Sequence, residues 1–153
     1  MKIAIVERAP VAVFYLRYTG PLGEPVGKFW RSTVSPWLAD HGLLDCPRYG
    51  ITVDDPMSTP ADECRYDACV EVAAGLSLPD AAETTIAGGR YAVTLFKGVG
   101  AEIGLAWRTF AVACITSHAA DRSRPAFEHY PRGAHYDART GIFSCELCIP
   151  VSS

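Results

Sequence analysis

The feature that most constrains how this chain folds is an internal repeat. When the sequence is aligned with itself at an offset of 78 residues, glycine, proline and aromatic positions coincide without a gap from about residue 11 to residue 72. The matched pairs are Gly20 with Gly98, Pro47 with Pro125, Tyr18 with Phe96, Phe29 with Trp107, Tyr49 with Phe127 and Val70 with Cys148. Self-similarity at a fixed spacing indicates one supersecondary unit used more than once. We therefore expect two copies, over about residues 11–72 and 89–150.

Both halves have the same predicted order of elements. Runs of β-branched and aromatic residues predict strands near residues 11–18, 48–53, 64–72, 90–96, 126–130 and 142–150. Apolar residues at helical spacing follow the first strand of each half: Phe29, Trp30, Thr33, Val34, Trp37 and Leu38, then Ile103, Leu105, Ala106, Phe110 and Ile115. Pro36 predicts a kink or a restart of the first helix. Gly42 predicts its end.

The order of elements predicts the fold class. Each half reads β-α-β-β, so we expect an α+β fold: a tandem, pseudo-twofold repeat with an antiparallel-rich sheet and helices on one face. The connector AAGLSLPDAAETTIAGG, residues 73–89, is rich in alanine and glycine and is predicted to be a loop. Because each half has too few apolar residues for a core of its own, a single domain over residues 1–153 is expected.

Charge and hydropathy exclude several classes of function. The net charge is −3 with no basic block, which argues against direct nucleic-acid binding. No apolar run approaches the roughly 20 residues of a membrane span. The N-terminus lacks the apolar core and cleavage site of a signal peptide, so we expect a cytoplasmic protein. Neither a phosphate loop nor a dinucleotide fingerprint occurs, and no cofactor is predicted.

The six cysteines are predicted to be reduced thiols, as in most cytoplasmic proteins. Cys145 and Cys148 have the CxxC spacing of some metal and redox sites. They fall in a predicted strand, where residues three apart point to opposite faces. No second pair accompanies them, so we predict no metal site and interpret the cysteines as small core residues.

A glutamate in the short aromatic stretch PAFEHYP is the first candidate functional residue. The repeat sets Glu128 opposite Gly50, so the scaffold can form without a carboxylate there. Along a strand, Glu128 and Tyr130 share one face and Phe127 the other. If Phe127 points into the helix-covered core, Glu128 points away from it. A carboxylate among aromatic rings suits an organic cation. The alternative is an exposed glutamate on a solvated face.

Several short motifs together resemble one known family. They are Tyr18-Thr-Gly-Pro21, Trp30, Gly50-Ile-Thr-Val-Asp-Asp-Pro56, Arg65-Tyr-Asp67 and Phe127-Glu-His-Tyr130. Over nearly the whole chain, they resemble the GyrI-like small-molecule-binding family, which also supplies effector domains of AraC-type and MerR-type activators. The resemblance implies a cleft near the pseudo-twofold axis, with Glu128 facing ligands in it. The Asp54-Asp55-Pro56 segment itself is predicted to be a turn.

The resemblance also implies a function. Without a helix-turn-helix before it, the chain resembles a stand-alone module that binds hydrophobic, often cationic, compounds. The expected ligand-binding residues are Glu128, Tyr130, Trp30, Trp107 and Tyr91. The alternative interpretation of Trp30, Trp37 and Trp107 is that they are core residues, because amphipathic helices bury such side chains.

Two other functions stay open. One is hydrolysis of cyclopropane-bearing alkylating natural products, in which Glu128 activates water and Tyr91 or Tyr130 is the acid. The other is inhibition of DNA gyrase through protein contact.

The chain departs from the family pattern in its second half. It reads Phe96-Lys-Gly-Val-Gly100 where the family usually has His-x-Gly-Pro-Tyr, and Cys114-Ile115 where a Trp-Leu pair is usual. The charged stretch over residues 119–124 stands in place of the expected helix end. These changes remove an aromatic and a polar group from the lip of the second half.

Overall fold

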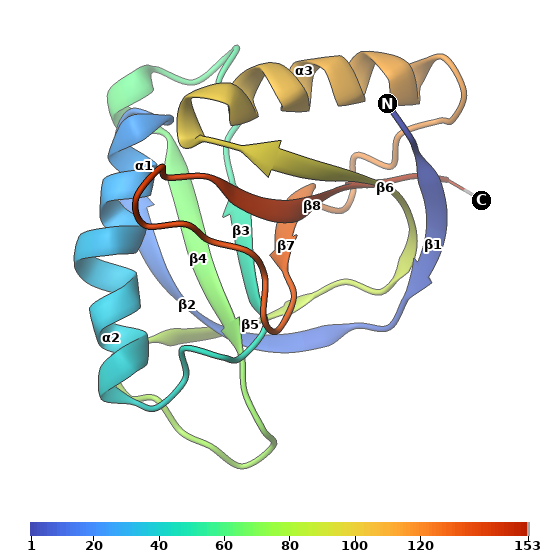
Figure 1. Ribbon diagram of the computed structural model, residues 1–153. Coiled ribbons are helices and arrows are strands. Elements are labelled where there is room, and N and C mark those ends of the chain that lie inside the picture. Colours follow the sequence, from blue (N-terminus) through green and yellow to red (C-terminus); the bar gives the residue numbers. More distant parts are fainter. Residues whose placement is uncertain (153) are drawn as a thin grey trace.

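A computed structural model describes residues 1–152 as one eight-stranded sheet with three α-helices on its outer face (Figure 1). The strands are β1 (Ala4–Arg8), β2 (Val11–Thr19), β3 (Arg48–Thr52), β4 (Arg65–Glu71), β5 (Ala82–Ile86), β6 (Gly89–Gly98), β7 (Phe127–Tyr130) and β8 (Phe143–Pro150). Their order is β1-β6-β8-β7-β3-β4-β2-β5, and every pairing is antiparallel. The predicted α+β fold with an antiparallel sheet is therefore confirmed.

The two α-helical regions lie where the spacing of apolar residues predicts them. They are α1 (Glu24–Phe29), the π-helical turn η1 (Trp30–Val34), α2 (Ser35–Asp40), the short 3-10 turn η2 (Ala61–Glu63) and α3 (Gly100–Ile115). Pro36 lies in the first turn of α2, so the helix restarts there after the π turn, as predicted. Gly42 has φ 68° just after the helix and ends it. No helix in residues 1–152 is long and apolar enough to cross a membrane.

Two strands escaped the sequence analysis. The connector predicted to be a loop contains β5, and the first eight residues contain β1. Both strands lie at the edges of the sheet and are exposed along most of their length. Edge strands with two solvated faces lack the alternation of apolar and polar residues by which strands are recognised. β1 pairs with β6, and β5 pairs with β2.

The strand order has the same form on both sides of the β7–β3 contact. From this contact the strands run β3, β4, β2, β5 in one direction and β7, β8, β6, β1 in the other. The ungapped register fails at the last strand, because Ile51 pairs with Asp67 whereas His129 pairs with Glu146. The second loop thus holds one residue more. Superposition of the two halves stays a prediction of the repeat.

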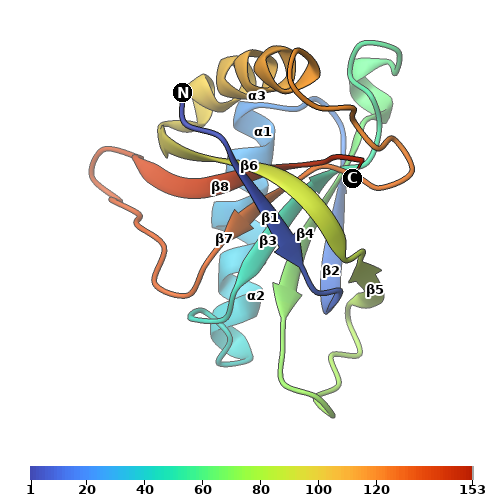
Figure 2. The same ribbon diagram turned by 90° about the vertical axis from the view of Figure 1, so that its right-hand side faces the viewer.

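The sheet is curled (Figure 2), and apolar side chains are buried on both of its faces. Its outer face lies under the helices, with Val34 and Leu38 packed over β4 and Phe110 and Cys114 packed over β6 and β8. The inner face forms a separate core that contains Phe127. The condition under which the sequence analysis placed Glu128 away from the helices, with Phe127 beneath them, is therefore not met. The outward face of β7 carries Glu128, because successive side chains alternate.

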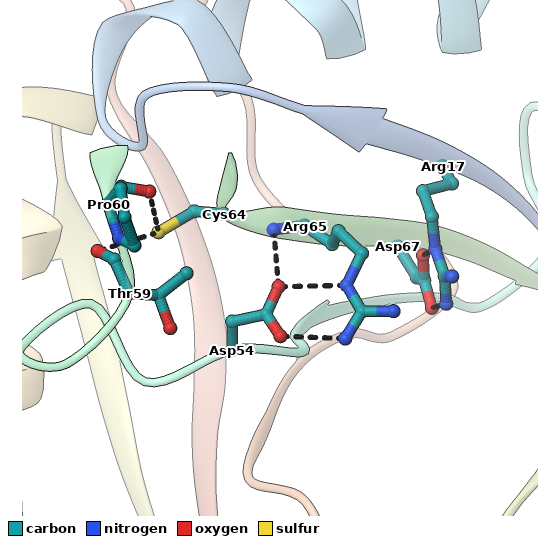
Figure 3. A network of polar contacts seen from close by, with 7 residues as sticks. All are labelled: Arg17, Asp54, Thr59, Pro60, Cys64, Arg65 and Asp67. Atoms are coloured by element: carbon teal, nitrogen blue, oxygen red, sulfur yellow. Dashed lines mark hydrogen bonds and ion pairs between the residues drawn. The ribbon is translucent and has the colours of Figure 1, made fainter. Parts of the chain in front are cut away.

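The turn after β3 is held by a carboxylate (Figure 3). Asp54 accepts hydrogen bonds from the backbone nitrogen of Arg65 at 2.9 Å, from Nε at 2.9 Å and from Nη2 at 2.7 Å. These bonds lower the pKa of Asp54 to about 2. On the neighbouring strands, Arg17 grips Asp67 in the same bidentate way, at 2.7 and 2.9 Å. The turn that the sequence predicts is thus also an ionic link to β4.

The cysteines lead to a first prediction. Cys145 and Cys148 lie in different cores on opposite faces of β8, as their spacing predicts. All six thiols are free, and Cys46 alone is not fully buried. Burial raises the pKa of Cys148 to about 12 and that of Cys69 and Cys145 further. Because the thiolate is the reactive form, DTNB should label Cys46 first and the other five only on unfolding. A native burst of more than one thiol, or one that survives Cys46→Ser, would contradict this.

Candidate functional site

The candidate site is a buried carboxylate where the two halves of the sheet meet. Glu128 is 7 % exposed. Its Oε1 accepts hydrogen bonds from the hydroxyls of Tyr66 at 2.8 Å and Tyr130 at 3.0 Å. Its Oε2 accepts one from Nε1 of Trp107 at 3.3 Å. Nε1 of Trp30 donates to the hydroxyl of Tyr66 at 3.0 Å and so extends the network to the first helix.

Gly50 makes room for this network. It pairs directly with Glu128 across the β3–β7 contact. A Cβ added to Gly50 would overlap the hydroxyl of Tyr66 and lie 2.6 Å from Oε1 of Glu128. The sequence comparison set these two positions against each other as independent equivalents. In the fold they are partners, and the missing side chain at one accommodates the carboxylate at the other.

The charge of Glu128 is not neutralised within the described chain. No ion pair of residues 1–152 includes this carboxylate. Burial raises the pKa of Glu128, and the bonds from Tyr66, Tyr130 and Trp107 lower it by less. Burial and the nearby carboxylate raise the phenol pKa of Tyr66 and Tyr130 well above the ordinary value. Both tyrosines therefore stay neutral donors.

Half-buried aromatic side chains form the cover of the carboxylate: Trp107 and Tyr130 contact it, and Trp30 and Phe143 pack near Tyr130. The ring of Tyr130 lies 5.7 Å from that of Trp30 and 6.1 Å from that of Phe143. Trp30 comes from the π turn and Trp107 from α3, so each half contributes one tryptophan. A ligand that contacts Glu128 has to displace part of this cover.

Four of the five predicted ligand-binding residues come together here. Tyr91 does not. Its ring packs 5.1 Å from Phe127 in the inner core, and its hydroxyl donates to the carbonyl oxygen of Ala87 at 2.6 Å. Tyr91 faces the inside of the curl because it alternates with outward-facing residues along β6. It therefore cannot serve as an acid beside Glu128, whereas Tyr130 lies within hydrogen-bonding distance.

Tyr66 is the residue that the sequence analysis missed. It is buried, donates the shortest hydrogen bond to Glu128 and lies 62 residues away in sequence. The signal was present in the Arg65-Tyr-Asp67 motif, since Tyr66 alternates with two charged residues and so faces the other side of β4. Only the pairing of β4 with β3, and of β3 with β7, brings it to Glu128.

Comparison with known protein families matches residues 1–152 to the GyrI-like small molecule binding domain. The chain belongs to the GyrI-like family. A relative from Escherichia coli K12, a DNA gyrase inhibitor, is 28 % identical over 150 residues, and the match covers 95 % of this chain and 92 % of the relative. Glu128, in the FExY motif, is thus part of a small-molecule-binding domain.

Solved structures share the GyrI-like fold. SAV2435 bound to tetraphenylphosphonium has a TM-score of 0.70 at 15 % identity and covers 100 % of this chain and 95 % of its own. The C-terminal domain of EcmrR has a TM-score of 0.70 at 10 % identity, over 99 % of this chain and 98 % of its own. At these identities the similarity establishes the fold alone.

Proposed function

We propose that this GyrI-like domain binds hydrophobic organic cations, with Glu128 as the counter-charge and Trp30, Trp107 and Tyr130 as the aromatic walls. The observation that carries the proposal is a buried carboxylate that receives three neutral donors and no cation from the described residues. A buried charge without a counter-ion is costly. A bound cation removes that cost, and aromatic ring faces attract the same ligand.

Ligand binding should break the longest hydrogen bond to Glu128 and keep the two shorter ones. The bond from Trp107 to Glu128, at 3.3 Å, is longer than the two tyrosine bonds. If Trp107 turns away, Oε2 becomes available to a ligand while Tyr66 and Tyr130 still hold Oε1. The tryptophan ring can then pack on the ligand. In this scheme, aromatic side chains close the site when no ligand is bound and line it when a ligand is present.

The proposal is tested with two ions of the same shape and opposite charge. Calorimetric titration should give tetraphenylphosphonium at least about tenfold higher affinity than tetraphenylborate, because only the cation gains from Glu128. The similarity to a structure that holds tetraphenylphosphonium motivates the choice of probe. Equal affinity for the two ions, or no binding of the cation, would contradict the proposal.

The pH dependence follows from the direction of the pKa shift. Burial raises the pKa of Glu128 above its ordinary 4.5, so the folded protein holds this proton to a higher pH than the unfolded chain does. As pH rises through that interval, the free protein should lose stability and then level off, while affinity for tetraphenylphosphonium should increase. Thermal unfolding with and without the ligand, between about pH 4 and 8, measures both. Glu128→Gln should abolish both trends; if the trends persist, another group causes them.

Inhibition of DNA gyrase is the second candidate, and the name of the Escherichia coli relative favours it. A supercoiling assay with purified gyrase tests it directly. Inhibition by both wild type and Glu128→Gln would place the contact outside the carboxylate site. Inhibition that tetraphenylphosphonium relieves would connect the two functions.

A further inference from the structure

A second charged residue lies on the same face of the sheet as Glu128. Arg48 pairs with Tyr130 across the β3–β7 contact. Its guanidinium carbon lies 5.6 Å from the centre of the Tyr130 ring, the same ring whose hydroxyl donates to Glu128. The aromatic cluster therefore has an internal cation stacked on one of its walls.

This arginine lacks the partner that comparable arginines have. Arg8, Arg65 and Arg124, the other half-buried arginines, lie 3.8, 2.7 and 2.8 Å from a carboxylate oxygen. No ion pair of residues 1–152 includes Arg48. Its Nε is buried without a hydrogen-bond acceptor, one of two such side-chain atoms in the described chain. A buried donor without an acceptor is unfavourable and calls for a partner.

The unpaired edge of the Arg48 guanidinium is the Nε–Nη2 edge, through which two other arginines of this chain bind carboxylates. Arg17 grips Asp67 through Nε and Nη2, and Arg65 grips Asp54 through the same two nitrogens. The Tyr130 ring lies against the Arg48 guanidinium and takes no hydrogen bond from its edge, so Nε is left unpaired but buried, and a ligand has to move part of its cover to reach it. Burial lowers the pKa of Arg48, and the nearby Tyr130 and Asp45 raise it by less.

Glu128 does not supply that anion. It stands opposite Gly50, and Arg48 lies two residues further along β3. Such diagonal neighbours on one face of a sheet are roughly 7–8 Å apart. Gly50 has no side chain, and the hydroxyl of Tyr66 lies next to it, so a ligand that contacts both charges has to displace part of this aromatic network. The outer face thus presents a carboxylate and a guanidinium, separated by about the span of an aromatic ring system.

We propose that Arg48 is the anion-binding half of the site, so that the preferred ligands are aromatic zwitterions. The ligand's cationic group contacts Glu128, and its carboxylate accepts hydrogen bonds from the Nε–Nη2 edge of Arg48. This inference rests on the proposed function, because it needs a ligand between the two charges. It narrows the ligand class from hydrophobic cations in general to those that also carry a carboxylate.

Two dyes with the same ring system test this inference. Rhodamine 110 carries a free carboxylate, and rhodamine 123 is its methyl ester and a plain cation. Fluorescence anisotropy near neutral pH should show wild type binding rhodamine 110 about tenfold more tightly than rhodamine 123. Arg48→Met, which keeps a stem that packs on Tyr130, should lose about tenfold for rhodamine 110 and nothing for rhodamine 123. Arg48→Lys keeps the positive charge but cannot form two parallel hydrogen bonds to a carboxylate, so its affinity for rhodamine 110 should lie between those of wild type and Arg48→Met.

The two dyes separate failure of this inference from failure of the proposed function. Equal wild-type affinity for both dyes, unchanged by Arg48→Met, would overturn the role of Arg48 and leave cation binding intact. If Arg48→Met does not fold, the wild-type comparison and Arg48→Lys still decide. If wild type prefers rhodamine 123, Arg48 repels cations rather than binding anions, and the inference is wrong. If wild type binds neither dye and does not bind tetraphenylphosphonium, both proposals fail.

Discussion

Gly50→Ala should destabilise the protein by about 1–3 kcal/mol, although alanine is usually the easier residue to order in a strand. The new methyl group would overlap the hydroxyl of Tyr66 and crowd Oε1 of Glu128, both of which are buried. Neither atom lies at the end of a flexible exposed side chain, so relief requires a shift of β4 or β7. In a chain of this length, thermal unfolding should show a decrease of about 2–4 °C for each kcal/mol.

A second glycine provides the control. Gly104 lies within α3, and a Cβ there would meet only Nη1 of Arg108, at 3.7 Å. Gly104→Ala should therefore leave the melting temperature unchanged or raise the stability by about 0.5–1 kcal/mol. Tyr66→Phe in the Gly50→Ala background should recover part of the loss, because it removes the overlapping hydroxyl. If Gly50→Ala melts at the same temperature as wild type, the network can accommodate the extra methyl group, and this explanation of Gly50 is wrong.

Glu128→Gln should weaken the binding of tetraphenylphosphonium by about tenfold to a hundredfold, which corresponds to about 1–3 kcal/mol for a close, partly desolvated charge pair. Glutamine is nearly the same size, and its amide oxygen can still accept from Tyr66 and Tyr130. Its amide nitrogen faces Trp107 and loses only the longest bond, at 3.3 Å. Because the buried charge is gone, the melting temperature at neutral pH should hold or rise.

A control has to show that the loss of affinity comes from the charge of Glu128 itself and not from the change in the net charge of the protein. Glu83 lies on the exposed edge strand β5, so Glu83→Gln makes the same change in net charge away from the site. It should leave tetraphenylphosphonium affinity unchanged. A neutral hydrophobic ligand should lose much less than the cation on Glu128→Gln. If both variants bind the cation as wild type does, Glu128 is not part of the binding site.

Local patterns predicted much of the fold, and they failed where a residue's role depends on the curl of the sheet. Alternation along β7 correctly put Glu128 and Tyr130 on one face and Phe127 on the other. It could not reveal which face the helices cover, because a curled sheet has an apolar core on both sides. Tyr91 was misplaced for the same reason.

Contacts between distant strands were beyond reach of the sequence. Glu128 was selected from one short motif, but its partner Tyr66 and its neighbour Arg48 are set by two strand pairings that no local pattern specifies. The repeat offset set Gly50 against Glu128, and the strand register pairs the same two residues. It gave no sign that the two would touch, because a repeat shows equivalence between positions and not their distance.

The pairing of β1 with β6 has a consequence for synthesis on the ribosome. Residues 4–8 leave the ribosome well before their partners at residues 89–93. At about 5–20 residues per second, the first strand waits on the order of ten seconds for its partner. It spends that time unpaired, and β2 likewise keeps one free edge until β5 is made. A ribosome that stalls near the middle of the message would therefore display open strand edges, and a nascent chain of this kind depends on uninterrupted translation or on chaperones to avoid aggregation.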